Sequence, residues 1–107
     1  MTKGQICLPN GRVLATVEVE PAGDLLLGRL IHLEDTVNAA LFTEYEHAVL
    51  SQLLVEVEQL DTRIAGLSLL FIADHGVLRA VEDLQLYPRQ RTVSFSLRPS
   101  DGSGVDP

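Results

Sequence analysis

Four side chains in this sequence have types and spacings that could bind a ligand: His32, Tyr87, Arg89 and Arg91. Arg89 and Arg91 closely follow Tyr87, and two guanidinium groups beside an aromatic ring form a small anion-binding site when they lie at the rim of a sheet. His32 could stand at the mouth of a pocket between the helix and the sheet. The alternative for both arginines is surface pairing with acidic side chains, which contributes about 0–1 kcal/mol for each pair.

No pattern in the chain indicates a catalytic centre, a metal site or a bound cofactor. Glu44 and His47 have the i, i+3 spacing of carboxylate-bridged metal sites, but that chemistry needs a second Glu-x-x-His pair, which the sequence lacks. The single cysteine, Cys7, lies in an apolar stretch, so we expect a buried thiol and not a nucleophile. The glycine-rich loops that cradle phosphates are also missing from the sequence. We therefore expect no catalytic residues, no metal and no cofactor.

Alternation of apolar and polar side chains predicts the strands that must position these residues. The clearest strand covers residues 12–20, where every second side chain is apolar. Residues 25–33 predict the next strand, and Gly28 within it indicates a bulge or a close approach of two backbones. Residues 77–86 fit either a strand or a helix, of which we favour the strand. Two further strands are expected at 67–73 and 91–97, with turns at 8–11, 21–24, 74–76 and 87–90.

One long amphipathic helix is expected between the strands. Thr43 and Glu46 have the spacing of a capping box, which predicts the helix start, and Gly66 predicts its end. Apolar side chains recur along it at spacings of three and four: Tyr45, Val49, Leu53, Val57, Leu60, Ile64 and Leu67. Other apolar side chains lie beside or opposite this stripe, where a single sheet would not cover them: Ala48, Leu50, Leu54 and Val55. We expect these four to contact a partner molecule, with ordinary surface exposure as the alternative.

The fold class expected from these elements is α+β, a mostly antiparallel β-sheet of about five or six strands packed against one main α-helix. The chain has 107 residues, the length of one domain, which we place at residues 1–98. Residues 99–107 consist mainly of Ser, Gly, Asp and Pro, so we expect a disordered C-terminal tail there.

The charge balance limits the partners that the chain could bind. Eight basic and fifteen acidic side chains give a net charge of −7, which opposes binding to nucleic acid and to anionic membrane surfaces. Acidic residues concentrate between Glu18 and Glu58, where Arg29 is the only lysine or arginine. The sequence contains one cysteine and no apolar run long enough to span a membrane, so we expect a soluble, cytoplasmic protein.

These observations favour a small acidic protein that acts through protein–protein contacts and not through catalysis. It would be a homodimer, or an adaptor or inhibitor that presents an acidic surface to a basic partner protein. The alternative is a domain that binds a small molecule or an anion, or a small enzyme, with a pocket between the helix and the sheet.

Overall fold

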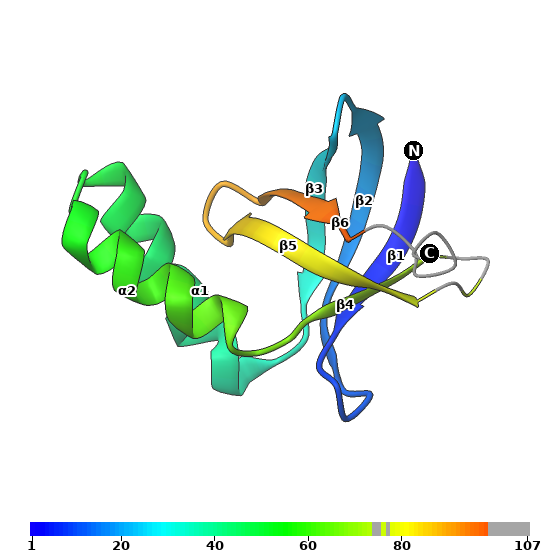
Figure 1. Ribbon diagram of the computed structural model, residues 1–107, viewed down its shortest axis with the longest axis horizontal. Coiled ribbons are helices and arrows are strands. Elements are labelled where there is room, and N and C mark those ends of the chain that lie inside the picture. The colour runs from blue at the N-terminus through cyan, green and yellow to red at the C-terminus, as the bar shows by residue number, and fades with distance from the viewer. Residues whose placement is uncertain (74–75, 77, 99–107) are drawn as a thin grey trace, which may run out of the picture.

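The computed structural model describes residues 1–73, 76 and 78–98, and its six strands form a closed antiparallel β-barrel with two helices beside it (Figure 1). The elements are β1 (Thr2–Cys7), β2 (Val13–Ala22), β3 (Leu25–Leu33), α1 (Thr36–Leu50), α2 (Leu54–Ala65), β4 (Leu70–Ala73), β5 (Leu78–Tyr87) and β6 (Thr92–Leu97). The tail predicted at 99–107 and most of the turn predicted at 74–76 lie outside the described residues.

Strand β1 closes the barrel because it pairs along both of its edges. The strands follow the order β1-β2-β3-β6-β5-β4, and β4 returns to β1 through antiparallel pairs such as Gly4 with Ala73. Gly4 permits this close pairing, since a Cβ there would lie 2.6 Å from the Phe71 ring and 2.8 Å from the Ile72 carbonyl oxygen. The expected open sheet packed on one main helix was therefore wrong. Periodicity shows which face of a strand is buried, but not which strand edges pair.

Inward-facing side chains from all six strands fill the barrel. Phe95 is fully buried, and its ring centroid lies 5.2 Å from that of Phe71 across the interior. The alternation predicted for residues 12–20 is confirmed in β2, and the preference for a strand over a helix at 77–86 is confirmed by β5. The close backbone approach predicted at Gly28 is also confirmed, because a Cβ there would overlap the carbonyl of Glu18 on β2.

Helix α1 begins earlier than the capping-box pattern predicted. The buried Asp35 caps its N-terminus, because Asp35 Oδ1 accepts from the backbone N–H of Val37 at 2.9 Å and of Asn38 at 3.2 Å. The Asn38 side chain also donates to Asp35 Oδ2 at 2.7 Å, and this hydrogen bond lowers the pKa of Asp35. Thr43 therefore lies inside α1, and the predicted start at Thr43 was wrong.

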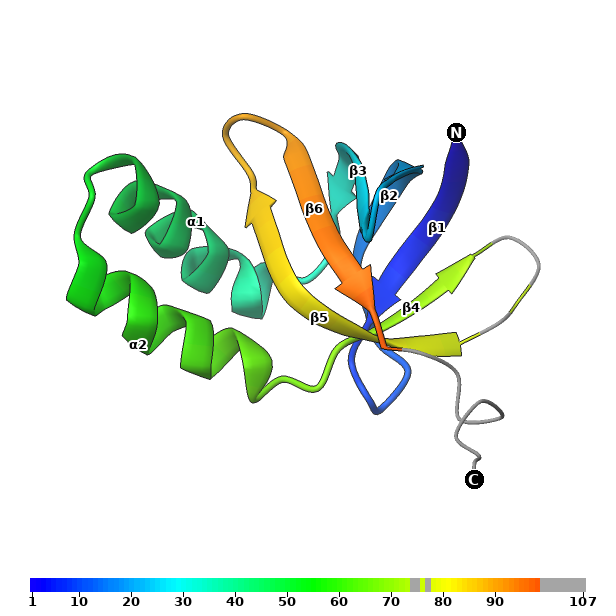
Figure 2. The same cartoon turned by 45° about the horizontal axis from the view of Figure 1, so that its top comes forward.

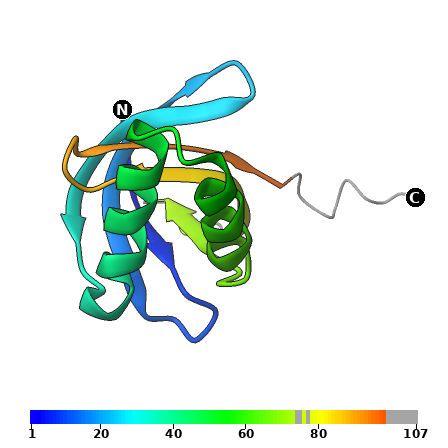
Figure 3. The ribbon, with the colours of Figure 1, turned by 90° about the vertical axis from the view of Figure 1, so that its left-hand side faces the viewer.

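The predicted single helix is broken into α1 and α2 by a turn at residues 51–53, and the two helices lie side by side next to the barrel (Figure 3). Leu53 N–H donates to Ala48 O at 2.9 Å and Gln52 N–H donates to Val49 O at 3.1 Å, which are the two hydrogen bonds of a Schellman motif. Gln52 adopts φ 58°, a left-handed conformation that glycine usually supplies. Neither described helix is long and apolar enough to cross a membrane.

We predict that Gln52→Gly stabilises the protein by about 0.5–1 kcal/mol, because glycine adopts a left-handed conformation without the steric cost of a Cβ. Urea unfolding of the variant and the natural chain measures this difference. The matched control is Gln59→Gly, at an exposed position within α2. This substitution should lower the free energy of unfolding by about 1 kcal/mol. Equal destabilisation by both substitutions would contradict the left-handed assignment of Gln52.

Candidate functional site

Tyr87, predicted from sequence as a ligand-binding residue, packs against α1 at the end of β5. Its ring stacks on that of Tyr45, with centroids 6.1 Å apart and planes 24° apart. The Tyr87 hydroxyl donates to Gln85 Oε1 at 2.9 Å. Burial raises the pKa of Tyr87 above its usual range, and the charges of Asp61 and Glu46 raise it further. Tyr87 thus joins the barrel to the helices, and the hydrogen bond of its hydroxyl stays within β5.

Arg89 and Arg91 lie at the turn between β5 and β6, and both are exposed. Arg91 donates from Nη2 to the carbonyl oxygen of Ile31 at 2.8 Å, so this guanidinium group braces the turn against β3. Neither arginine lines the groove between α2 and β5 that is described below. The anion-binding role expected for the two arginines stays a prediction. The contact observed for Arg91 is its hydrogen bond to Ile31.

His32 is exposed at the end of β3, with Nε2 3.9 Å from Glu34 Oε1. The neighbouring Asp35 caps the N-terminus of α1. Glu44 and His47 are both exposed on α1. Across residues 1–73, 76 and 78–98, no group of three or more metal-ligating side chains comes together. Cys7 is buried, as predicted, and this burial raises the pKa of its thiol.

A buried carboxylate that the sequence analysis did not identify fastens α1 to the β5–β6 turn. Glu46 is 1% exposed, and its two oxygens accept from the backbone N–H groups of Arg89 at 2.9 Å and Gln90 at 3.0 Å. This contact explains why Glu46 does not act in the predicted capping box. Glu46 follows the buried Phe42 by four residues, so both side chains lie on one face of the helix. This spacing is the sequence feature that could have identified Glu46 as a buried residue.

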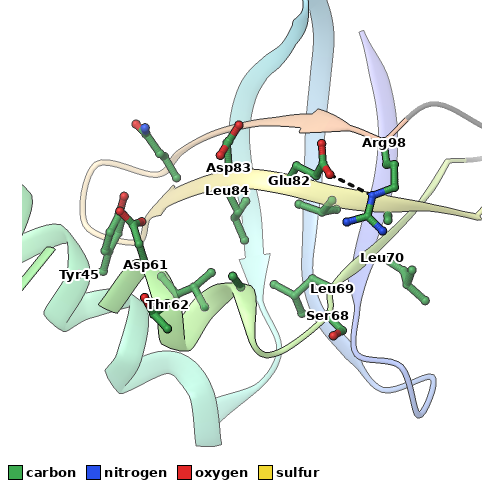
Figure 4. A pocket seen from close by; sticks show the side chains of 15 residues that line it. Tyr45, Asp61, Thr62, Ser68, Leu69, Leu70, Glu82, Asp83, Leu84 and Arg98 are labelled. Carbon is green, nitrogen blue, oxygen red and sulfur yellow. Dashed lines mark hydrogen bonds and ion pairs between the residues drawn. The ribbon is translucent and has the colours of Figure 1, made fainter. Parts of the chain in front are cut away.

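A groove of about 1090 Å³ lies between α2 and β5 (Figure 4). Its apolar floor is formed by the buried side chains of Ile64, Leu69 and Leu84. The charged side chains that line it are Asp61, Glu82, Asp83 and Arg98. Three acids against one base leave the groove with a formal charge of −2, so it favours cationic groups and disfavours anions.

One basic group is already neutralised inside this groove. Arg98 Nε lies 2.9 Å from Glu82 Oε2, and Figure 4 shows this pair at the end of the groove remote from Tyr45. Asp61 lies at the opposite end, beside Tyr45. Burial raises the pKa of Tyr45 strongly, and a hydrogen bond and the charge of Asp61 raise it further. Tyr45 therefore stays a neutral phenol at physiological pH.

The backbone edge of β5 that faces this groove has a strand partner over only part of its length. Pairing with β4 covers Leu78–Ala80, and Val81 N–H donates to Leu69 O at 3.0 Å. Beyond Val81, the strand pairing of β5 among the described residues is with β6. A β-bulge interrupts the β5–β6 register between Glu82 and Gln85, and Asp83 within it adopts φ 55°. The groove therefore offers main-chain hydrogen-bonding groups as well as carboxylates.

A second surface feature lies at the turn between the two helices, at the end of the molecule remote from the barrel (Figure 2). Its side chains are apolar and exposed, and we call them the hairpin tip: Leu50, 62% exposed; Leu53, 38%; Leu54, 74%; and Val55, 65%. Ala48, which the sequence placed on this face, is 2% exposed and packs in the core. The tip is therefore formed by the helix break and not by the side of one long helix.

Comparisons with models of protein families, with curated proteins and with solved structures gave no match for this chain.

We predict that Glu46→Gln destabilises the protein by about 1–3 kcal/mol, because the amide has one acceptor oxygen in place of two and directs an N–H group at a backbone donor. Urea unfolding measures the loss, and amide hydrogen exchange should show reduced protection of Arg89 and Gln90. The control is Glu44→Gln on the exposed face of α1, with an expected change within about 0.5 kcal/mol. A Glu46 variant as stable as this control would exclude a structural role for the buried carboxylate.

Proposed function

We propose that this protein is a non-catalytic binding domain that holds a basic, extended segment of a partner protein in the groove between α2 and β5. The observation that supports the proposal most directly is the edge of β5 along the groove, which has no strand partner on that side beyond Val81 among the described residues. Extended peptides bind proteins by adding to such edges, and main-chain hydrogen bonds supply part of their affinity.

The charge of the groove supports a basic partner. Asp61 and Asp83 could each accept a lysine or arginine, while the apolar floor would contact the intervening side chains of an extended peptide. The net charge of −7 would also accelerate the encounter with a basic protein. β5 contributes residues 80–85 to the lining, a length of roughly 20 Å, so a segment of about six residues would fill the groove.

The proposal refines the adaptor or inhibitor expected from the sequence, in which an acidic surface binds a basic protein. The alternative of an anion site between helix and sheet receives no support from the groove, because its lining is net negative. A cytoplasmic location, favoured by the single cysteine, stays part of the proposal.

We predict that a fluorescently labelled peptide of alternating Lys and Val binds the full chain saturably, whereas a peptide of alternating Glu and Val does not. Fluorescence anisotropy measures both affinities. The double variant Asp61→Asn with Asp83→Asn should weaken the Lys-Val peptide about tenfold, because each exposed ion pair contributes up to ~1 kcal/mol. Added salt should weaken binding as well.

Asp24→Asn is the matched control, since Asp24 is exposed at the β2–β3 turn and does not line the groove. The proposal fails if the two peptides bind equally, or if the double variant and the control variant bind the Lys-Val peptide with the same affinity as the natural chain.

A homodimer formed through the hairpin tip is a second candidate, favoured by the exposure of Leu54 and Val55. Exposed apolar side chains that gather at one place mark contact surfaces more often than scattered ones do. The tip is also flanked by few charges, with Glu56 as the acidic residue in the first turn of α2. Isologous contact between two tips would cover the same four side chains on both copies.

For this candidate we predict a mass of twice 11.7 kDa by light scattering coupled to gel filtration. The double variant Leu54→Ser with Val55→Ser should shift the protein to the monomer mass. The control is Val37→Ser, which changes a side chain that is 74% exposed near the start of α1, away from the tip. A monomer mass for the natural chain at every concentration would exclude the homodimer and leave the groove proposal intact.

A further inference from the structure

β4 already uses the beginning of the β5 edge that borders the groove. The two strands run antiparallel, with Leu70 opposite Ala80. Val81 N–H then donates to Leu69 O at 3.0 Å, so the chain just before β4 occupies this edge as far as Val81. A segment held along the rest of the edge would therefore continue the line of β4.

The sheet favours one direction for such a segment. All six strand pairings of the described chain are antiparallel. Antiparallel pairing is slightly more stable for each residue than parallel pairing, whose hydrogen bonds are slanted. Purely antiparallel sheets are also more frequent than random mixing of strand directions would produce. A segment added to the edge of β5 should therefore run antiparallel to β5, as β4 does.

Contacts of β5 define the two ends of the groove. At the beginning of β5, Ala80 O accepts from Arg98 N–H at 2.9 Å, and we call this side the Arg98 end. Farther along the strand, the Tyr87 ring stacks on Tyr45 with centroids 6.1 Å apart, and we call that side the Tyr45 end. Figure 4 shows the same order. A segment antiparallel to β5 would therefore begin at the Tyr45 end and finish at the Arg98 end.

The formal charges of the groove are distributed unevenly between these ends. Glu82 Oε2 lies 2.9 Å from Arg98 Nε, so this pair leaves the Arg98 end without net formal charge. The buried, apolar Leu69 lines the groove at the same end (Figure 4). Asp61 is exposed at the Tyr45 end, remote from the basic side chain of the described lining. The Tyr45 end thus favours a cation, and the Arg98 end favours an uncharged group.

We propose that the groove binds segments in one direction, with lysine or arginine toward the N-terminal end and uncharged, apolar residues toward the C-terminal end. This inference rests on the proposed function and specifies the sequence of the partner. The basic side chains would contact Asp61 and then Asp83, which lies between the two ends, and the apolar side chains would contact Leu69. A segment of reversed order would match either the antiparallel direction or the charges, but not both.

The experiment compares two peptides of the same composition and opposite order, Lys-Val-Lys-Val-Thr-Val and Val-Thr-Val-Lys-Val-Lys. Both are acetylated and amidated, so that their ends carry no charge. Each competes with the labelled Lys-Val peptide for the full chain, and fluorescence anisotropy measures the displacement. We expect the first peptide to bind at least fivefold more tightly than the second, a difference that corresponds to one exposed ion pair of up to ~1 kcal/mol.

A nitroxide attached to the first peptide reports its direction independently of its affinity. In NMR spectra of the isotope-labelled full chain, a nitroxide at the N-terminus of the peptide should broaden the amide signals of Asp61 and Gln85 most. A nitroxide at its C-terminus should instead broaden those of Leu69 and Val81 most. The opposite pattern would overturn the proposed direction.

A variant of the chain tests the charge at the Tyr45 end. Asp61→Asn should weaken the first peptide about fivefold, whereas Glu58→Gln, at an exposed position of α2 outside the groove, should change its affinity less than twofold. Equal affinity of the two peptides, or tighter binding of the second, would overturn the inference and leave the groove proposal intact. Absence of binding by both peptides would overturn the proposed function together with this inference.

Discussion

The structure depends on the pairing of β1 with both β2 and β4, which closes six strands into a ring. The closing strand β4 has four residues, whereas its other neighbour, β5, has ten. β4 therefore covers only the beginning of β5, and Leu69 O, just before β4, accepts from Val81 N–H. The same closure leaves the groove along β5.

Two buried carboxylates attach the helices to this ring. Asp35 and Glu46 are the buried charged residues of the described chain, and each accepts from two backbone N–H groups. Such contacts supply the hydrogen bonds that a buried charge requires. The groove acids Asp61 and Asp83 are exposed, so a partner can reach their side chains. Position in the fold thus separates acids with a structural role from acids that a ligand could reach.

The candidate site was only partly predictable from the sequence. The excess of acidic residues was evident from composition, and it carries over into the charge of the groove. Arg89 and Arg91 looked like an anion clamp because they are close in sequence, but their contacts tie them to Glu46 and Ile31 on other elements.

The amino-acid sequence by itself determined the buried faces of β2 and β6 and the excess of acidic residues, because alternation and charge are local properties of the chain. It favoured a strand over a helix at β5, and at Gly28 it left a bulge and a close backbone approach as alternatives. The tertiary structure alone decided the barrel closure, the helix break at Gln52 and the groove. The barrel closure and the groove depend on contacts between residues distant in sequence. A left-handed Gln52 costs about 1 kcal/mol, and the turn that it forms lets α1 and α2 lie side by side next to the barrel, an arrangement that helical periodicity does not encode.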